Sequence, residues 1–239
     1  MRSLIHLISE DDAVIPINYQ HALSSALYSF IRSANPDLSS SLHHSQDFKF
    51  FNFSMMKVPK PAIKGPEIHL KKGTHVMFNF SSPAGDILEA TISGMLSKGA
   101  MEILGSRFII ENIEITHTPE FSSKARFRTL SPIYIDLVKE DGRRWDLMPT
   151  DPEWKARIED NSRKKYAHYF GKEYKGDFDI AEIRKMSTKR INIGGQWWRA
   201  SHVEFLLKAN PDMLKFLWDT GMGSRNSQGF GCLEYMGDD

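Results

Sequence analysis

Apolar residues recur at two different spacings along the first half of the chain, which predicts strands and helices in alternation. Residues 3–8 have the short, mostly apolar pattern of a strand, whereas apolar residues in 19–32 recur at helical spacing. Further strands are expected at 48–53, 75–80 and 107–116, with a helix over 85–97 and a loop over 59–66. Asn35 and Pro36 are expected to end the first helix, because the residue before a proline disfavours helical geometry. The predicted order is βαββαβ.

The second half repeats this order of elements. Strands are expected at 125–138, 180–191, 197–207 and 230–235, and helices at 151–169 and 211–220. The last helix has a capping residue at Asn210, a proline at its first position and Gly221 just past its end. Two successive βαββαβ units predict an α+β protein with two tandem ferredoxin-like (RRM-like) domains, residues 1–118 and 119–239. Sheets of this kind, with one open face, commonly bind RNA.

Composition limits the class of protein. The chain has 239 residues, of which 41% are hydrophobic and 26% charged, values typical of globular domains and not of disordered chains. No run approaches the length of a membrane span, so no membrane association is expected. Cys232 is the one cysteine, which excludes an internal disulfide and fits a reducing compartment, so a cytoplasmic location is expected.

Positive charge is concentrated in one stretch, although the net charge is only +1. Residues 155–199 hold twelve Lys and Arg against six Asp and Glu, with tyrosines and tryptophans between them. Such a stretch is typical either of a surface that binds a polyanion or of a solvated helix face. The side chains expected to give sequence-independent affinity for RNA are Arg163, Lys164, Lys165, Arg184, Lys185, Lys189 and Arg190.

A glycine-rich segment, residues 221–231, lies between the last helix and the last strand. Glycine lets backbone N–H groups approach a phosphate closely and adopts positive φ without strain. The segment lacks the Gly-Lys-Ser/Thr of a nucleotide-hydrolase loop and, because it follows a helix, does not fit a dinucleotide fingerprint. A helix-ending glycine would account for Gly221 alone. It would not account for Gly223, Gly229 and Gly231.

The pattern Gly-x-Gly-x-x-x-x-x-Gly-Phe-Gly after two ferredoxin-like units resembles the repeat-associated (RAMP) superfamily. Within it, the chain resembles the CRISPR repeat-processing endoribonucleases over nearly its whole length. The likeness includes the helix that begins Tyr19-Gln20-His21, the segment Ser41-Leu42-His43 leading to Lys49-Phe50-Phe51, and Leu130-Ser131-Pro132-Ile133.

This resemblance implies that the chain binds CRISPR repeat RNA and cuts precursor transcripts into guide RNAs without a metal or other cofactor. The ribose 2′-OH would attack the phosphate, leaving a 2′,3′-cyclic phosphate and a 5′-OH. Tyr28, His43 and Lys49 lie at the positions of a Tyr/His/Lys catalytic set in the family. His43 would be a general acid or base, Tyr28 its counterpart, and Lys49 would stabilise charge on the phosphate. The expected RNA-binding residues of the glycine-rich segment are Gly221, Gly223, Ser224, Arg225, Asn226, Ser227, Gly229, Phe230 and Gly231.

Each of these assignments has an alternative. His43 is favoured by its spacing from the other two residues, but the adjacent His44 could replace or assist it, and in an extended segment the two would point oppositely. Tyr28 could be a core residue, and Lys49 could lie on the outer face of a strand. Trp197 and the next residue, Trp198, should face opposite sides of a strand, and core positions are favoured for both over stacking on a base.

No metal site is expected, since the nine histidines are scattered and no His-x-x-x-His pair occurs. Two other functions stay open: a non-catalytic RNA-binding RAMP subunit of a CRISPR effector complex, and a ferredoxin-like enzyme that acts on a small molecule. The sequence also leaves open whether the chain forms a homodimer and whether it joins other CRISPR-associated proteins.

Overall fold

The structure is a computed structural model and describes residues 1–44 and 47–238. The chain forms two compact units. The N-terminal unit consists of Met1–Lys49 and Met55–His117, and the C-terminal unit of Phe50–Ser54 and Thr118–Asp239. The short segment Phe50–Ser54, which contains β3 (Asn52–Phe53), therefore belongs to the C-terminal unit although it lies early in the sequence.

An antiparallel sheet forms the centre of the N-terminal unit. Strand β1 (Arg2–Ser9) lies between β6 (His75–Ser81) and β8 (Ser106–Thr116), and β7 (Ala100–Ile103) pairs with the far side of β8. Ile5 is fully buried and lies opposite Phe78 on one side and Ile113 on the other. The alternation of apolar side chains in β1 thus directs one face of the strand into the core.

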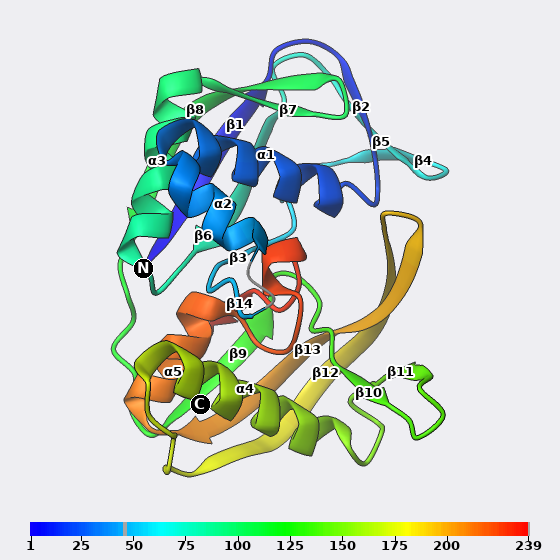
Figure 1. Cartoon of the computed structure of the whole chain (residues 1–239). Coiled ribbons are helices and arrows are strands. Elements are labelled where there is room, and N and C mark those ends of the chain that lie inside the picture. Colours follow the sequence, from blue (N-terminus) through cyan, green and yellow to red (C-terminus); the bar gives the residue numbers. More distant parts are fainter. Residues whose placement is uncertain (45–46, 239) are drawn as a thin grey trace. The chain divides into compact units, whose positions relative to one another are not determined.

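Helices α1 (Gln20–Ala34) and α3 (Gly85–Lys98) cover one face of this sheet, as Figure 1 shows. They approach closely at Gly94, where an added Cβ would lie 2.2 Å from the carbonyl oxygen of Phe30. A shorter helix, α2 (Pro36–His44), follows α1 directly. A separate small sheet, which the sequence patterns did not predict, has the order β2-β5-β4 and consists of Ala13–Pro16, Glu67–Leu70 and Ala62–Lys64.

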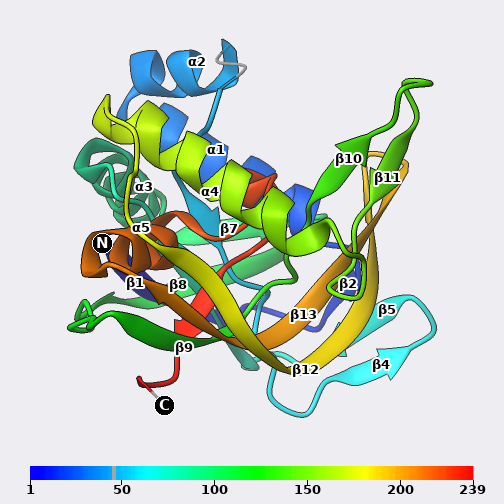
Figure 2. The same cartoon turned by 90° about the horizontal axis from the view of Figure 1, so that it is seen from below.

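The C-terminal unit has the βαββαβ order of a ferredoxin-like fold, which confirms the predicted α+β class. Its antiparallel sheet has the order β12-β13-β9-β14. In chain order the elements are β9 (Lys124–Thr129), α4 (Trp154–Phe170), β12 (Phe178–Ile193), β13 (Gln196–Ala209), α5 (Pro211–Thr220) and β14 (Leu233–Tyr235). Figure 2 shows α4 and α5 on the same side of the sheet. Helix α5 has the predicted bounds, and the Asn210 side chain accepts a hydrogen bond from the Met213 N–H.

The hairpin β12–β13 is longer than the rest of its sheet. Strand β9 pairs only with residues Glu204–Lys208 of β13, so the outer part of the hairpin extends past β9 to the turn at Gly194 and Gly195. Both glycines have positive φ, as tight hairpin turns require. A second, shorter hairpin, β10 (Asp136–Val138) and β11 (Arg144–Asp146), lies beside this outer part in Figures 1 and 2.

Three predicted elements are wrong in part. The strand expected over 125–138 ends at Thr129, because residues 130–135 form no continuous strand and β10 begins a different hairpin; Ile133 forms an isolated bridge with Ser201 of β13. The strand expected over 48–53 is reduced to Asn52–Phe53, since Phe50 has a φ of 52° and interrupts the extended backbone. The loop expected over 59–66 contains strand β4, and Pro36 begins helix α2, which the sequence patterns did not predict. None of the helices in the described parts of the chain is long and apolar enough to cross a membrane.

The contact at Gly94 leads to a stability prediction. Replacing a helical glycine by alanine usually stabilises a helix, but here the methyl group would collide with the backbone of α1. We expect Gly94→Ala to lower the free energy of unfolding by about 2 kcal/mol or more, measured by chemical denaturation. Ser93→Ala, an exposed neighbour on the same helix, is the control and should change it by less than about 0.5 kcal/mol. Equal effects of the two substitutions would contradict the close approach of the helices.

Candidate functional site

Tyr28 and His43 contact each other in the N-terminal unit. Tyr28 lies on α1 and is half-buried, and His43 lies in the last turn of α2 and is exposed. Their ring centroids are 4.7 Å apart, with an angle of 38° between the ring planes. Two of the three residues expected to carry chemistry are therefore neighbours in space, although fifteen positions separate them in the sequence.

The start of helix α2 explains how His43 comes to lie there. Asn35 follows α1, and its side-chain oxygen accepts a hydrogen bond from the Leu38 N–H at 3.0 Å, as a helix-capping residue does. Pro36 occupies the first helical position, where its missing N–H costs nothing. The Asn-Pro pair thus ends one helix and begins the next. Leu42 is buried, which fixes the last turn of α2 and with it the position of His43.

Lys49 reaches the same turn of α2. Its ammonium group donates a hydrogen bond to the backbone carbonyl of Leu42, the residue that precedes His43. Burial lowers the pKa of Lys49, an effect that nearby Asp47 partly offsets. The alternative of an outward-facing strand position does not hold, because residues 48–51 are not in a strand. Tyr28, His43 and Lys49 therefore gather around the C-terminal end of α2; we call these three residues the Tyr-His-Lys cluster.

His44 is directed back onto its own helix. Its Nδ1 lies 2.8 Å from the backbone oxygen of Ser40, and because a carbonyl oxygen only accepts, Nδ1 carries the proton. The two histidines lie on a helix, so the opposite orientation that an extended segment would give them does not apply. The contact with the Tyr28 ring is made by His43.

The glycine-rich segment of the C-terminal unit is organised by a buried lysine. The ammonium group of Lys165, on α4, donates to the carbonyl oxygens of Gly221 at 2.8 Å and Gly223 at 3.2 Å. It also donates to the side-chain oxygen of Asn226 at 2.7 Å. The Asn226 amide in turn donates to the backbone oxygens of Met222 and Phe230. The side chains of Lys165 and Asn226 thus fix both ends of the glycine-rich segment.

Packing accounts for three of the four glycines. Gly221, Gly223 and Gly231 have positive φ and are buried, and a Cβ added to Gly223 or Gly231 would lie 2.4 Å or less from a backbone oxygen. The N–H of Gly231 donates to the Pro132 oxygen, and that of Ser224 donates to the Tyr134 oxygen. The close approaches that need glycine are therefore made to the chain's own backbone, at Tyr134 for Gly223 and at Met222 for Gly231.

Three residues expected to contact RNA are instead buried or hydrogen-bonded within the C-terminal unit. Lys165 has 1% of its surface exposed, so the expectation of an exposed cation is wrong there. Phe230 is fully buried. The guanidinium of Arg163 is held by Glu159 and by the backbone oxygens of Tyr174 and Gly176, which connects α4 to the loop after it. These three side chains stabilise the fold of the unit.

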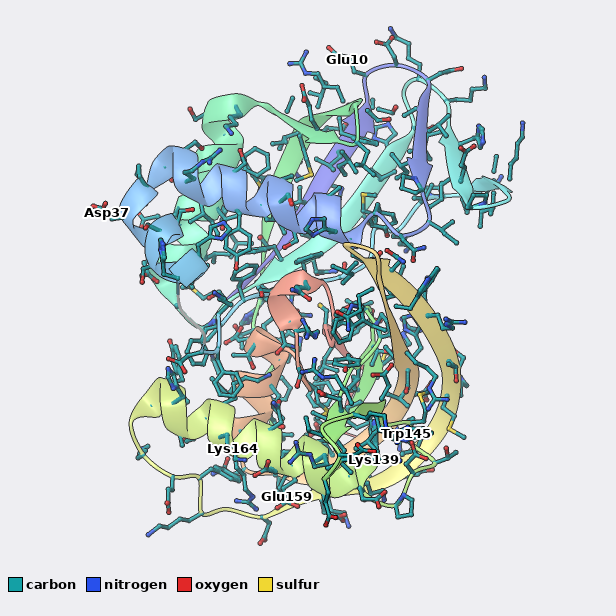
Figure 3. All side chains as sticks on the ribbon, turned by 45° about the vertical axis from the view of Figure 1, so that its right-hand side comes forward. Glu10, Asp37, Lys139, Trp145, Glu159 and Lys164 are labelled. Atoms are coloured by element: carbon teal, nitrogen blue, oxygen red, sulfur yellow. The ribbon has the colours of Figure 1, made fainter. Side chains whose placement is uncertain are left out.

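The remaining cationic residues differ in exposure. Lys164 is exposed on α4 (Figure 3) and pairs with Asp160. Lys189 on β12 is half-buried, and this burial lowers its pKa. Arg184, Lys185 and Arg190 are exposed on β12. Ser224, Arg225 and Ser227 of the glycine-rich segment are half-buried.

The sequence patterns did not predict that two tryptophans of the C-terminal unit are exposed. Trp197 is exposed, although a core position was favoured for it, whereas Trp198 is buried as expected. Trp145, in the unpredicted hairpin β10–β11, is exposed as well. The clusters Arg143-Arg144-Trp145 and Trp197-Trp198-Arg199 are the signal that could have found these residues, since tryptophan beside arginine is unusual on a purely solvated surface.

The three bonds made by Lys165 predict a large stability effect. Replacing Lys165 by methionine would keep most of its volume and leave two carbonyls and one amide oxygen without their donor. We expect Lys165→Met to lower the free energy of unfolding by about 2 to 4 kcal/mol in chemical denaturation. Lys164→Met removes a neighbouring exposed lysine and should change it by less than about 1 kcal/mol. Similar losses in both variants would contradict the structural role of Lys165.

The burial of the Lys165 amine also leads to a prediction of how the stability of the chain depends on pH. Burial lowers the pKa of Lys165 to about 7 in the folded chain, below the value of 10.5 for a free lysine. Between these two pH values the unfolded state binds more protons, so stability should rise with pH. We expect the free energy of unfolding of the unmodified chain, relative to that of Lys165→Met, to increase from pH 7 to pH 10. A difference that does not change over this range would mean that the ammonium stays charged in the folded state.

Comparison with known proteins places the whole chain in one family. The family model for the C-terminal part of CRISPR associated protein Cas6 matches residues 116–235, and a model for the N-terminal part of Cas6 matches residues 14–114. A Methanocaldococcus jannaschii protein named CRISPR-associated endoribonuclease Cas6 1 is 31% identical over 237 residues, 98% of this chain and 92% of that protein. The Pyrococcus furiosus CRISPR-associated endoribonuclease Cas6 is 32% identical over 99% of this chain and 90% of its own length.

A solved structure described as CRISPR associated protein Cas6 superposes with a TM-score of 0.85. It has 31% sequence identity and covers 99% of both chains. The family models, the relatives and this structure all extend across both units, so the resemblance predicted from the sequence is confirmed. The chain belongs to the Cas6 family of CRISPR-associated proteins.

Proposed function

We propose that this protein is an endoribonuclease that cleaves CRISPR repeat RNA in precursor transcripts to give guide RNAs, without a metal. The observation that carries the proposal is the Tyr-His-Lys cluster, in which Tyr28 contacts His43 and Lys49 binds the carbonyl next to His43. The relatives that match over nearly the full length are named endoribonucleases, which supports the same activity.

The cluster contains the residue types that metal-free RNA cleavage needs. The ribose 2′-oxygen attacks phosphorus as its proton passes to a base, and the bond from phosphorus to the 5′-oxygen breaks as that oxygen receives a proton. In the proposed mechanism His43 and Tyr28, whose rings are in contact, act on the same phosphodiester, one on each oxygen. Lys49 supplies positive charge for the phosphate as negative charge develops on it. The products are a 2′,3′-cyclic phosphate and a 5′-OH.

His43 is the proposed proton-transfer residue, because its ring lies against Tyr28 while the Nδ1–H of His44 is used by Ser40. Imidazole suits this step because its ordinary pKa lies near neutral pH. A lysine suits the position of Lys49 for a different reason. Its ammonium group is a point charge that can contact a phosphate oxygen without a fixed orientation.

RNA binding is proposed for the exposed cations of the C-terminal unit. Lys164, Arg184, Lys185 and Arg190 are exposed, and the half-buried Arg225 of the glycine-rich segment is included with them. Contacts of these groups with phosphates would release counterions, so this share of the affinity weakens as salt is raised. Lys165 supports this surface from within, because it holds the segment that carries Arg225.

Cleavage of repeat RNA by single variants, measured in EDTA under single-turnover conditions, tests the proposal. We expect His43→Ala to lower the cleavage rate constant by about 10² to 10⁴-fold, the usual contribution of a general acid or base. Its affinity for RNA should stay within about threefold of the unmodified chain, because the imidazole acts on protons and contributes little to phosphate binding. His44→Ala is the matched control and should lower the rate by less than about tenfold.

Two results would overturn the proposal in different ways. If repeat RNA binds but stays intact with the unmodified chain, the protein is a non-catalytic RNA-binding relative. If repeat RNA does not bind at any salt concentration, an enzyme that acts on a small molecule becomes the better account. A larger loss in His44→Ala than in His43→Ala would keep the activity but reverse the assignment of the histidines.

A further inference from the structure

A cavity of about 570 Å³ lies in the C-terminal unit between the hairpin β10–β11 and the outer part of the hairpin β12–β13. Its lining is dominated by two kinds of side chain, tryptophan and arginine. The six residues concerned, which we call the Trp-Arg pocket, are Arg144, Trp145, Arg190, Trp197, Trp198 and Arg199. None of them belongs to the Tyr-His-Lys cluster.

Hydrogen bonds hold the two walls of the pocket together. Asp146, next to Trp145, accepts a hydrogen bond from the Arg199 N–H at 2.8 Å, and its backbone oxygen accepts one from the Arg199 guanidinium at 3.0 Å. Its other carboxylate oxygen accepts one from the Tyr134 hydroxyl at 3.1 Å. Strand β11 is thus fixed to the edge of β13 beyond the end of β9. These bonds fix the two walls of the pocket relative to each other.

Each tryptophan of the pocket has an arginine against its ring. Arg190 lies 5.1 Å from the centre of the Trp197 ring, and Arg199 lies 5.8 Å from that of Trp145. Lys139 also lies over Trp145, at 4.5 Å (Figure 3). These contacts orient the rings and concentrate positive charge around them. Asp146, the acidic residue in the lining, accepts hydrogen bonds from Tyr134 and from the Arg199 N–H.

The glycine-rich segment reaches this pocket through Arg225. The guanidinium carbon of Arg225 lies 3.7 Å from the centre of the Trp198 ring, and Trp198 is one of the lining residues. Arg225 has a φ of 59°, so the segment adopts a strained conformation at the residue that makes this contact. The loop held by Lys165 and the pocket are therefore parts of one continuous structure.

The exposure of two large rings indicates the kind of ligand. Trp145 has 47% and Trp197 has 51% of its surface exposed, and apart from the buried Trp198 the other side chains that line the cavity are charged or polar. Exposed aromatic rings with arginines around them match the two parts of a nucleotide: the base stacks on the rings, and the phosphate pairs with guanidinium groups. The volume is that of a small-molecule pocket and fits one or two nucleotides, not a duplex.

We propose that the Trp-Arg pocket binds one unpaired nucleotide of the RNA, with its base stacked on Trp197 and Trp145 and its phosphate held by the surrounding arginines. The pocket would give the protein a preference for RNA that presents a single-stranded nucleotide to it. This inference rests on the proposed function, because it takes the RNA to be the substrate.

An abasic scan of the RNA combined with substitutions of Trp197 tests the pocket. The probe is a repeat RNA with a 2′-deoxy nucleotide at the cut site, and each nucleotide in turn lacks its base. With the unmodified chain, we expect one or two positions at which loss of the base weakens binding by about tenfold. With Trp197→Ala, intact RNA should bind about tenfold more weakly, and loss of the base at those positions should have no further effect.

Two further variants separate stacking from folding. Trp197→Phe keeps an aromatic ring and should restore most of the affinity and the sensitivity to the missing base. Met186→Ala removes an exposed apolar side chain from the neighbouring strand β12, and it should change neither the affinity for RNA nor the sensitivity to the missing base. Unfolding curves of Trp197→Ala that match those of the unmodified chain exclude a general loss of structure.

The outcomes distinguish the pocket from the proposed function. If the unmodified chain binds and cuts repeat RNA but no abasic position couples to Trp197, the pocket does not bind a base and the inference is wrong, whereas the proposed function stands. If the unmodified chain does not bind repeat RNA at all, both are wrong, and the pocket is more suited to a protein partner.

Discussion

A single buried ammonium group determines the arrangement of the C-terminal unit. Lys165 is placed in the interior, where an uncompensated charge would be strongly unfavourable, and its hydrogen bonds go to three oxygens that carry no formal charge. Those oxygens belong to the glycine-rich segment, so the segment can adopt only a conformation that presents them to α4. The positive φ values of Gly221 and Gly223 and the absence of their side chains are what allow this.

The consequences of this contact reach the surface of the unit. With Gly221, Gly223 and Asn226 fixed by Lys165, Arg225 lies against Trp198, and the N–H of Ser224 pairs with Tyr134. Tyr134 binds Asp146, which connects hairpin β10–β11 to β13. A helix, a loop and two hairpins are thus linked by polar contacts around a small apolar cluster that includes Trp198 and Phe230. The candidate binding surface owes its shape to these contacts, whereas the candidate chemistry lies in the N-terminal unit.

The parts of the fold that depend on regular periodicity could be predicted from the sequence. Helix α5 has strong local signals at both ends, Asn210-Pro211 and Gly221, and its predicted bounds agree with the structure. Helix α2 was missed because Asn35-Pro36 can end one helix and begin another, and only the packing of Leu42 decides between these. The hairpin β10–β11 was missed because its strands have three residues each, too few for a period to be recognised.

The candidate site, like the fold, could be predicted from the sequence only in part. The spacing of Tyr28, His43 and Lys49 identified three residues that do gather around one helix end, but that knowledge came from a family pattern, since spacing alone says nothing of distance. The role of Lys165 could not be predicted, because a lysine in a basic stretch is usually exposed and its burial depends on carbonyls 56 residues away. Trp197 is the converse case, an apolar residue that tertiary structure leaves exposed.

Identification of the RNA ends produced in EDTA tests the central claim most directly. If the Tyr-His-Lys cluster cleaves RNA through attack by the 2′-OH, mass spectrometry of the products will show a 2′,3′-cyclic phosphate on one fragment and a 5′-OH on the other, and RNA with a 2′-deoxy nucleotide at the cut site will stay intact. Fragments with a 5′-phosphate and a 3′-OH, or cleavage of the 2′-deoxy RNA, would contradict this account.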